Sequence, residues 1–191
     1  MLPEYYSVTT VIGFFLDKRW FNKEACERGT RVHLMCETNI DDPLDSGIDV
    51  PTDLAGYYES FMLWKSEAME DQIVMSKEPK LSCDELKITG HPDLVLASAD
   101  DVKDLTLIDY KTSKNKQPWW RLQLAAYKYM IDQSTTIKGV VNKYGSLRIR
   151  PGKKPLYNSY EDTYVEDIAL FINALKTAEF FKLWNWKEYN N

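Results

Sequence analysis

The sequence has few of the residues on which disulfide frameworks, metal clusters and membrane spans are built. Its 191 residues include three cysteines, Cys26, Cys36 and Cys83, and two histidines. An odd set of cysteines without CxxC spacing fits neither a disulfide framework nor a zinc site, so we expect reduced thiols of a cytoplasmic protein. No run of 18 apolar residues is present, and we expect no membrane span. The segment MLPEYYSVTT lacks a basic region followed by an apolar block, and we expect no secretory signal there.

The sequence also lacks a Walker A glycine-rich loop, so we do not expect an ATPase or a helicase. What it has is an uneven distribution of charge. The net charge is −5, yet residues 105–160 carry 11 basic and 2 acidic side chains, whereas residues 37–104 carry 5 basic and 17 acidic ones. A local basic face can bind phosphates even on an acidic protein. The alternative is a solvated charge asymmetry, and charge alone leaves both interpretations open.

Hydrophobic periodicity predicts helices first, then strands around one helix, then a final helix. Helices are expected at 8–16, 22–38, 53–71, 118–132 and 163–184. Strands are expected at 72–81, 85–97, 105–112, 136–144 and 147–150, and polar loops at 39–52 and 153–158. The length suits one domain, with a helical part at 1–71, a sheet core at 72–150 and a C-terminal helix at 160–186. The predicted fold is α/β (α+β), a central mixed sheet of four to five strands flanked by helices.

One predicted strand ends in charged residues. In LTLIDYKTSK, residues 105–114, side chains alternate across the strand, so Asp109 and Lys111 share one face roughly 6–7 Å apart. Burying both without partners is costly, and either an ion pair or a metal site would resolve this. In GHPDLVL, Asp93 precedes another apolar run, although GHPD alone is also a plausible turn. Two carboxylates and a lysine on neighbouring strands suit metal-assisted phosphodiester hydrolysis.

GHPD followed by IDYK resembles the active-site pattern of the PD-(D/E)xK nuclease superfamily, with Asp on one strand and Asp/Glu-x-Lys on the next. RGTRVH, residues 28–33, resembles the Gly-x-x-x-His helix motif of the RecB-like branch, and QLAAY, residues 123–127, resembles its Gln-x-x-x-Tyr motif. The motifs occur in family order over residues 29–127. The resemblance implies a restriction-endonuclease-like core and a RecB-like exonuclease acting in recombination, repair or phage DNA processing.

The resemblance also implies a set of site residues. The expected ligands of one or two Mg²⁺ or Mn²⁺ ions are His33, Asp93, Asp109 and the backbone carbonyl of Tyr110. The expected catalytic residues are Asp93, Asp109, Lys111, Gln123 and Tyr127, with the lysine positioning the attacking water and Gln123 and Tyr127 holding the substrate strand. An iron–sulfur cluster, found in some RecB-like nucleases, is not expected because no four-cysteine set is present.

The expected partner is DNA with a free end, in the cytoplasm of a bacterium or a phage-infected cell. A recombination or replication protein could be a further partner, and the chain could form an oligomer. Candidate nucleic-acid contacts are Lys114, Lys116, Trp119, Trp120 and Arg121. The tryptophans could stack on bases, but they could equally pack against the sheet, and we expect at least one to do so. Two functional alternatives stay open: a binding or assembly module of the same fold without useful activity, and a nuclease acting on RNA or DNA junctions.

Overall fold

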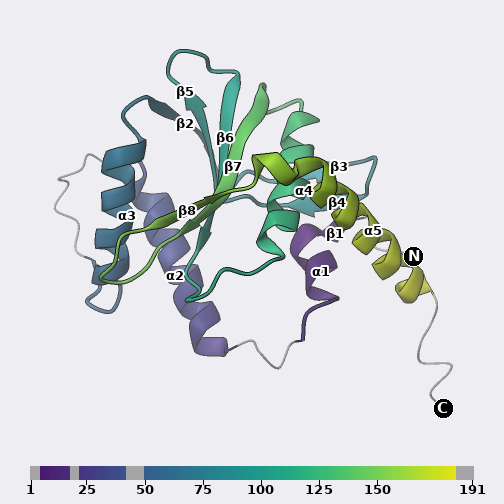
Figure 1. Ribbon diagram of the computed structural model, residues 1–191, viewed down its shortest axis with the longest axis horizontal. Coiled ribbons are helices and arrows are strands. Elements are labelled where there is room, and N and C mark those ends of the chain that lie inside the picture. Colours follow the sequence, from purple (N-terminus) through teal and green to yellow (C-terminus); the bar gives the residue numbers. More distant parts are fainter. Residues whose placement is uncertain (1–4, 18–21, 42–49, 184–191) are drawn as a thin grey trace.

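The computed structural model describes residues 5–17, 22–41 and 50–183 (Figure 1). Most of the predicted loop at 39–52 and the last residues of the predicted C-terminal helix lie outside these ranges. No helix within them is long and apolar enough to cross a membrane.

Helices and strands follow the predicted order. The helices are α1 (Val8–Gly13), α2 (Lys23–Asn39), α3 (Ala55–Ala68), α4 (Trp120–Asp132), the short 3-10 helix η2 (Glu161–Thr163) and α5 (Tyr164–Leu183). The strands are β1 (Tyr6–Ser7), β2 (Gln72–Lys77), β3 (Leu81–Cys83), β4 (Ile88–Gly90), β5 (Leu94–Ser98), β6 (Asp104–Lys111), β7 (Val140–Arg148) and β8 (Leu156–Ser159).

The main sheet has five strands in the order β2-β5-β6-β7-β8. All neighbours are antiparallel except β6 and β7, which are parallel and joined through α4. A parallel connection needs such a crossover, because the chain must return to the same end of the sheet before the next strand begins. A second, three-stranded sheet has the order β1-β4-β3. The predicted mixed sheet flanked by helices is confirmed, and the small second sheet is an addition to it.

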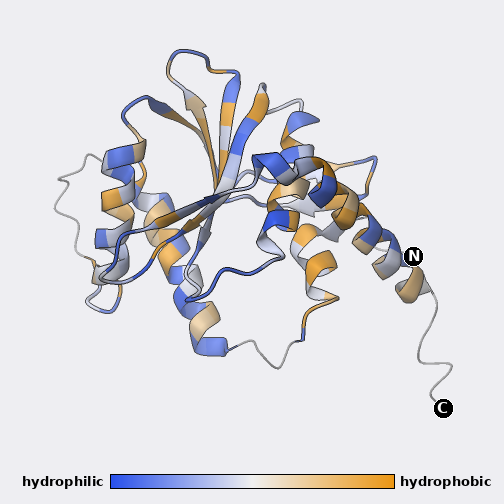
Figure 2. Ribbon diagram, in the orientation of Figure 1, coloured by the Kyte–Doolittle hydropathy of each residue, from blue (hydrophilic) through white to orange (hydrophobic). Residues whose placement is uncertain are grey.

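Helices cover both faces of the main sheet (Figure 1). Helices α2 and α3 lie on one face, and α1, α4 and α5 lie on the other. Each face has its own apolar cluster, one including Val32, Phe61 and Ile108 and the other including Leu107 and Leu124. Orange segments on the helices and the central strands mark these apolar faces in Figure 2. Because Leu107 and Ile108 are successive residues of β6, the alternation of the strand supplies both clusters.

Helices α1 and α2 begin at polar residues that satisfy free backbone amides. The Ser7 hydroxyl accepts a hydrogen bond from the Thr10 amide at 3.0 Å, and Asn22 Oδ1 accepts one from the Ala25 amide at 3.2 Å. Such caps stabilise the first turn, whose N–H groups have no partner inside the helix. Ser7 therefore caps α1, and Asn22 caps α2.

The strand boundaries differ from the prediction at four places. The expected strand 85–97 is two strands in different sheets, β4 and β5, because Pro92 lacks the N–H needed to continue a ladder. The strand expected at 72–81 also divides, at Glu78, whose φ is 42°. The strands expected at 136–144 and 147–150 are one strand, β7. The loop expected at 153–158 contains β8, whose four residues are largely solvated and so carry no apolar pattern.

We predict that Gly145→Ala lowers the free energy of unfolding by about 1–3 kcal/mol, the usual cost of overpacking. A Cβ at Gly145 would overlap the Asn158 carbonyl oxygen and come within 2.6 Å of Tyr157 Cζ, so β8 would have to move away from β7. Urea denaturation measures the change. Gly13→Ala is the matched control, since a Cβ there meets nothing within 4 Å and should leave stability unchanged or slightly raised. Equal stability of both variants would show that β8 does not lie against β7 in this way.

Candidate active site

The antiparallel pairing of β5 with β6 brings the two predicted carboxylates together. Leu94 lies opposite Ile108, so Asp93, the residue just before β5, comes beside Asp109 at the same end of the strands. Both aspartates are buried. Neither is bonded to an arginine in the part of the chain that the structure describes; their partners are a histidine, a backbone amide, a lysine and a glutamine.

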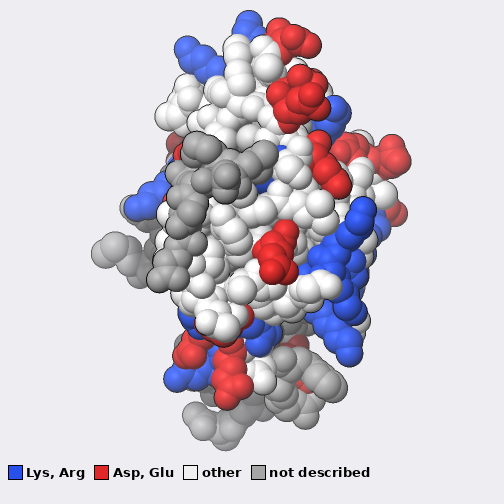
Figure 3. Space-filling model, turned by 90° about the vertical axis from the view of Figure 1, so that its left-hand side faces the viewer, with Lys and Arg blue, Asp and Glu red and all other residues white. Residues whose placement is uncertain are grey.

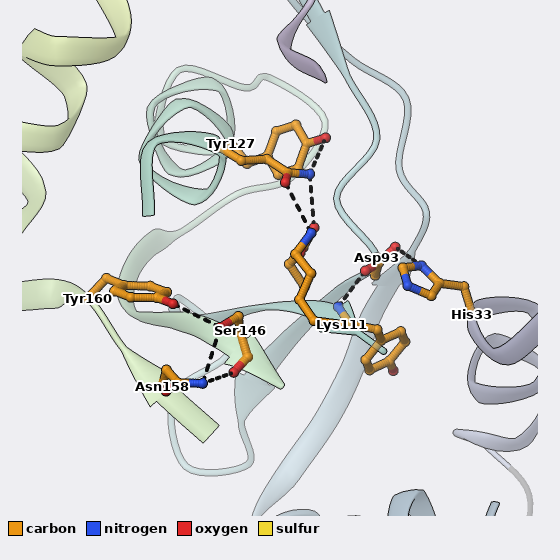
Figure 4. A network of polar contacts seen from close by, with 10 residues as sticks. His33, Asp93, Lys111, Tyr127, Ser146, Asn158 and Tyr160 are labelled. Atoms are coloured by element: carbon orange, nitrogen blue, oxygen red, sulfur yellow. Dashed lines mark hydrogen bonds and ion pairs between the residues drawn. The ribbon is translucent and has the colours of Figure 1, made fainter. Parts of the chain in front are cut away.

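Asp93 connects the sheet to helix α2. Its Oδ1 lies 3.0 Å from Nδ1 of His33, and its Oδ2 accepts a hydrogen bond from the Tyr110 amide at 2.5 Å. Helix α2 holds His33 there because Val32 and Cys36 are fully buried on its inner face. The His33 and Tyr110 rings are nearly perpendicular, with their centroids 5.8 Å apart. A residue 60 positions earlier in the chain thus joins the carboxylates at the strand ends (Figure 4).

Asp109 connects the sheet to helix α4 through a lysine and a glutamine. Lys111 forms an ion pair with Asp109 Oδ2 and donates a hydrogen bond to Gln123 Oε1 at 3.1 Å. The amide nitrogen of Gln123 donates to Asp109 Oδ1 and to the Tyr127 hydroxyl, both at 3.2 Å. Gln123 and Tyr127, one turn apart on α4, therefore share the face toward the site. Figure 4 shows Tyr127 and Lys111 within this network.

Helix α4 approaches the site closely because a glycine lies beneath it. A Cβ at Gly90 would come within 2.5 Å of Tyr127 Cε1. The absence of a side chain at this position lets the buried Tyr127 ring lie against the backbone of β4. The partner in this close approach is the tyrosine of the Gln-x-x-x-Tyr motif.

Burial and charge shift the proton affinities of the site in opposite ways. Burial raises the pKa of Asp109; Lys111 lowers it again, and the nearby Asp93 carboxylate raises it further. Burial lowers the pKa of His33, but the Asp93 carboxylate outweighs burial, and the net pKa is raised. Burial also raises the pKa of Tyr127, so its hydroxyl stays protonated and available as a donor. The Asp93 carboxylate therefore favours the protonated form of His33, whereas burial disfavours the charged form of Asp109.

The donor atoms suit a hard divalent ion, but they are engaged with one another. Carboxylate oxygens and an imidazole nitrogen are ligands that Mg²⁺ and Mn²⁺ accept. Within the described residues, no group of three or more His, Cys, Asp and Glu side chains has the spacing of metal ligands. Asp109 Oδ2 is nevertheless buried without a hydrogen-bond partner, with only the Lys111 charge beside it. Tyr110 meets Asp93 through its amide, and the predicted ligand role of its carbonyl stays a prediction.

The five predicted nucleic-acid contacts separate into two groups. Lys114 and Lys116 are exposed on the loop after β6. Trp120 is buried beneath Lys111, whose ammonium lies 5.8 Å from the ring centroid, and Trp119 packs against the core, as the packing alternative predicts. Arg121 Nε donates to Asp167 at 2.5 Å, and its guanidinium also pairs with Glu166 at 3.0 Å. These bonds hold α4 to α5, so Arg121 does not face the catalytic residues.

The sequence gives no signal for a second polar group beside Asp109. Ser146 of β7 lies opposite Asp109 in the parallel ladder and is fully buried. Its hydroxyl lies 3.0 Å from the Tyr160 hydroxyl, and the Asn158 amide reaches the Ser146 carbonyl at 3.4 Å (Figure 4). These residues come from two segments, β7 and the end of β8, and they come to the site through the β6–β7 register and the β7–β8 pairing. A fourth residue, Arg148, was likewise not anticipated, and its guanidinium donates to the carbonyls of Ser113 and Lys114.

An aspartate and an Asp-x-Lys pair on neighbouring strands of a mixed sheet, faced by a histidine helix and a glutamine helix, define a nuclease-type site. Residues 54–185 match the family model of the PD-(D/E)XK nuclease superfamily. This match covers more than half of the chain, and the chain belongs to the PD-(D/E)XK nuclease superfamily. No curated protein matches the sequence.

Solved structures share the fold. The crystal structure named "Putative exonuclease" from Eubacterium rectale has a TM-score of 0.52 and 13% identity, covering 92% of this chain and 82% of its own. An alkaline exonuclease from Laribacter hongkongensis has a TM-score of 0.46 and 10% identity, covering 97% of this chain and 93% of its own. At 13% identity, the similarity to the Eubacterium rectale structure supports the fold of this chain and nothing further.

We predict that Arg121→Met lowers the free energy of unfolding by about 2–3 kcal/mol, because it leaves the fully buried Asp167 carboxylate without its cation. This value lies below the roughly 3–5 kcal/mol usual for a broken buried pair, because the Arg121 side chain is 32% exposed. Thermal and urea denaturation measure it. The double variant Arg121→Met/Asp167→Leu should recover most of the loss, because a well-packed apolar pair removes the uncompensated charge. A stable single variant with weakened DNA binding would instead assign Arg121 to the nucleic-acid interface.

Proposed function

We propose that the protein is a Mg²⁺- or Mn²⁺-dependent DNA nuclease of the RecB-like kind, an exonuclease acting in recombination, repair or phage DNA processing. Membership of the nuclease superfamily supports the hydrolytic class. The finer assignment rests on the Gly29-x-x-x-His33 and Gln123-x-x-x-Tyr127 motifs beside the carboxylates. The observation that carries the proposal is the pairing of β5 with β6, which puts Asp93, Asp109 and Lys111 at one end of the sheet.

In the proposed reaction a water oxygen bonds to phosphorus, the P–O3′ bond breaks, and the leaving 3′ oxygen takes up a proton. The products are a 5′-phosphate and a 3′-hydroxyl. His33, Asp93, Asp109 and the Tyr110 carbonyl would hold the divalent ion, which when bound lowers the pKa of water and shields phosphate charge. In a β-strand, the N–H and C=O of one residue point to the same side of the strand. The Tyr110 carbonyl therefore points to the side on which the Tyr110 amide donates to Asp93.

Lys111 has the proton donors and the charge to orient the attacking water and to offset charge on the phosphate. Gln123 accepts from Lys111 through its oxygen and donates to both Asp109 and Tyr127 through its nitrogen, so it fixes the ammonium and the carboxylate relative to each other. The low-dielectric surroundings of buried Asp109 strengthen these interactions. Tyr127, kept protonated, can donate to a phosphate oxygen once the substrate strand is bound.

We predict that Asp109→Asn and Lys111→Ala each reduce Mn²⁺-dependent cleavage of linear DNA by about 10²–10³-fold or more, the usual effect of removing a group that stabilises transition-state charge. Gel assays of a labelled duplex, with and without chelator, measure the loss. Circular dichroism should show folded protein in both cases. Unchanged cleavage by either variant would overturn the proposal. Lys176→Gln on the exposed face of α5 is the matched control and should cleave at the wild-type rate.

Two alternatives stay distinct from this proposal. A binding or assembly module would bind DNA but turn over no substrate with Mg²⁺ or Mn²⁺. A nuclease with another substrate would prefer RNA or a branched junction in parallel digestions of single-stranded, duplex, nicked and circular DNA. We expect linear DNA to be degraded and circular DNA to survive, because the proposed enzyme requires a free end. Degradation of covalently closed circles would assign endonuclease activity instead.

A further inference from the structure

Basic side chains gather along one side of the site, on segments that the catalytic motifs do not include. They belong to the loop after β6 and to the hairpin that joins β7 to β8, and we call them the basic flank. Its members are Lys114, Lys116, Arg150, Lys153 and Lys154. In Figure 3, Lys and Arg side chains form a band along the right-hand edge, which is the side of the molecule facing the viewer in Figure 1, where β8 crosses in front of the sheet.

The two segments of the basic flank are tied together and to the end of the catalytic strand. The buried Arg148 guanidinium donates to the Ser113 carbonyl at 3.4 Å and also to that of Lys114. The Ile149 amide donates to the Lys111 carbonyl at 2.9 Å. Lys116 lies over the Tyr160 ring at 4.8 Å, just after β8. The loop and the hairpin therefore form one continuous surface next to Lys111, the last residue of β6.

The positive charge of this surface is not cancelled by its protein neighbours. Lys114, Lys153 and Lys154 are exposed and form no ion pair within residues 5–17, 22–41 and 50–183. The hairpin touches the start of α3, where the Gly152 amide donates to the Gly56 carbonyl at 3.3 Å. Two acidic residues lie three positions from Gly56: Asp53, which is already bound by both terminal nitrogens of Arg31 at 2.6 and 3.0 Å, and Glu59, which is exposed and, among the described residues, forms no ion pair with the lysines of the flank. A surface of this kind attracts a polyanion.

The basic flank lies within reach of a substrate strand that occupies the site. Arg148 pairs directly with Lys111, and Lys153 and Lys154 lie beyond Arg148 at the tip of the hairpin. At about 3.3 Å per residue, the tip is roughly 10–15 Å from Lys111. One strand of duplex DNA rises about 3.4 Å per nucleotide, so this distance corresponds to roughly three to four nucleotides.

The composition of the flank favours duplex phosphates over unpaired bases. Proteins hold single strands by stacking bases on exposed aromatic rings, whereas duplex backbones are held by lysine and arginine. Near the flank Trp120 and Tyr160 are buried, and Trp119 is packed against the core. Tyr157 is 42% exposed, and it lies opposite Leu147 in the β7–β8 pairing. The Leu147 side chain faces the α2–α3 layer, so the Tyr157 ring is also on that face of the hairpin. Lys116 lies on the opposite face, over Tyr160.

We infer that the basic flank holds the phosphate backbone of the duplex roughly three to four nucleotides from the scissile bond. This inference rests on the proposed nuclease function and adds to it a duplex-binding surface outside the catalytic motifs. The hairpin then acts by electrostatic positioning of the DNA and takes no part in the bond-breaking step. Its contribution falls with rising salt concentration, because each phosphate contact releases a bound counterion.

The test is the double variant Lys153→Gln/Lys154→Gln, measured by fluorescence anisotropy with a labelled blunt duplex and a single strand of the same sequence, in chelator so that no cleavage occurs. We expect about tenfold weaker duplex binding at about 0.1 M salt, and a salt slope of the logarithm of affinity that is smaller by about 1.8. Arg150 binds the main-chain oxygen of Lys154, so the hairpin contact stays available after substitution. Lys114→Gln is a second, independent variant, expected to weaken duplex binding in the same direction.

The matched control is Lys138→Gln/Lys176→Gln, which removes the same charge at the opposite end of β7 and on α5. It should bind the duplex within about twofold of wild type. Wild-type affinity and salt slope in the hairpin variant, an equal loss in the control, or a loss confined to the single strand would each overturn the inference. Failure of the nuclease proposal is separate: there the wild type would bind duplex yet cleave nothing, or Asp109→Asn would still cleave.

Discussion

The antiparallel pairing of β5 with β6 is the constraint on which the candidate site depends. Its register puts the Asp93 carboxylate against the Tyr110 amide and beside Asp109. A slip by one residue would turn every side chain of β6 to the other face of the sheet. Leu107 would then face the α2–α3 layer, and Asp109 and Lys111 would enter its apolar cluster unpaired. The apolar alternation that forms the two cores therefore also keeps the carboxylate and the ammonium on one face.

Charge compensation is the second requirement, because two buried carboxylates repel each other. His33 supplies a partner from one helical layer, and Lys111, held by Gln123, supplies one from the sheet. Each of these cations stabilises the carboxylate it contacts, and each would have to share that carboxylate with any divalent ion that binds. The polar contacts of the site hold its donor groups in fixed positions relative to one another.

The parts of the site that follow from local spacing could be predicted from the sequence. A period of two places Asp109 and Lys111 on one face, and a helical turn places Gln123 and Tyr127 on one face. The partners that come from distant segments could not be predicted. Ser146 lies opposite Asp109 only because the β6–β7 register shifts between Leu105 and Thr106, and no sequence pattern encodes that irregularity.

Charged residues show the same limit. Arg121 looks like a nucleic-acid contact in the sequence because it stands in a basic segment beside two tryptophans. Its partner, Asp167, is 46 residues away on α5 and is completely buried, so the pair is part of the helix packing. By contrast, Arg148 belongs to no sequence motif, yet its guanidinium donates hydrogen bonds to the loop after Lys111 and so connects that loop to the β7–β8 hairpin. A basic residue is available to a ligand only where no buried carboxylate or carbonyl has already bound it, and that depends on tertiary contacts rather than on composition.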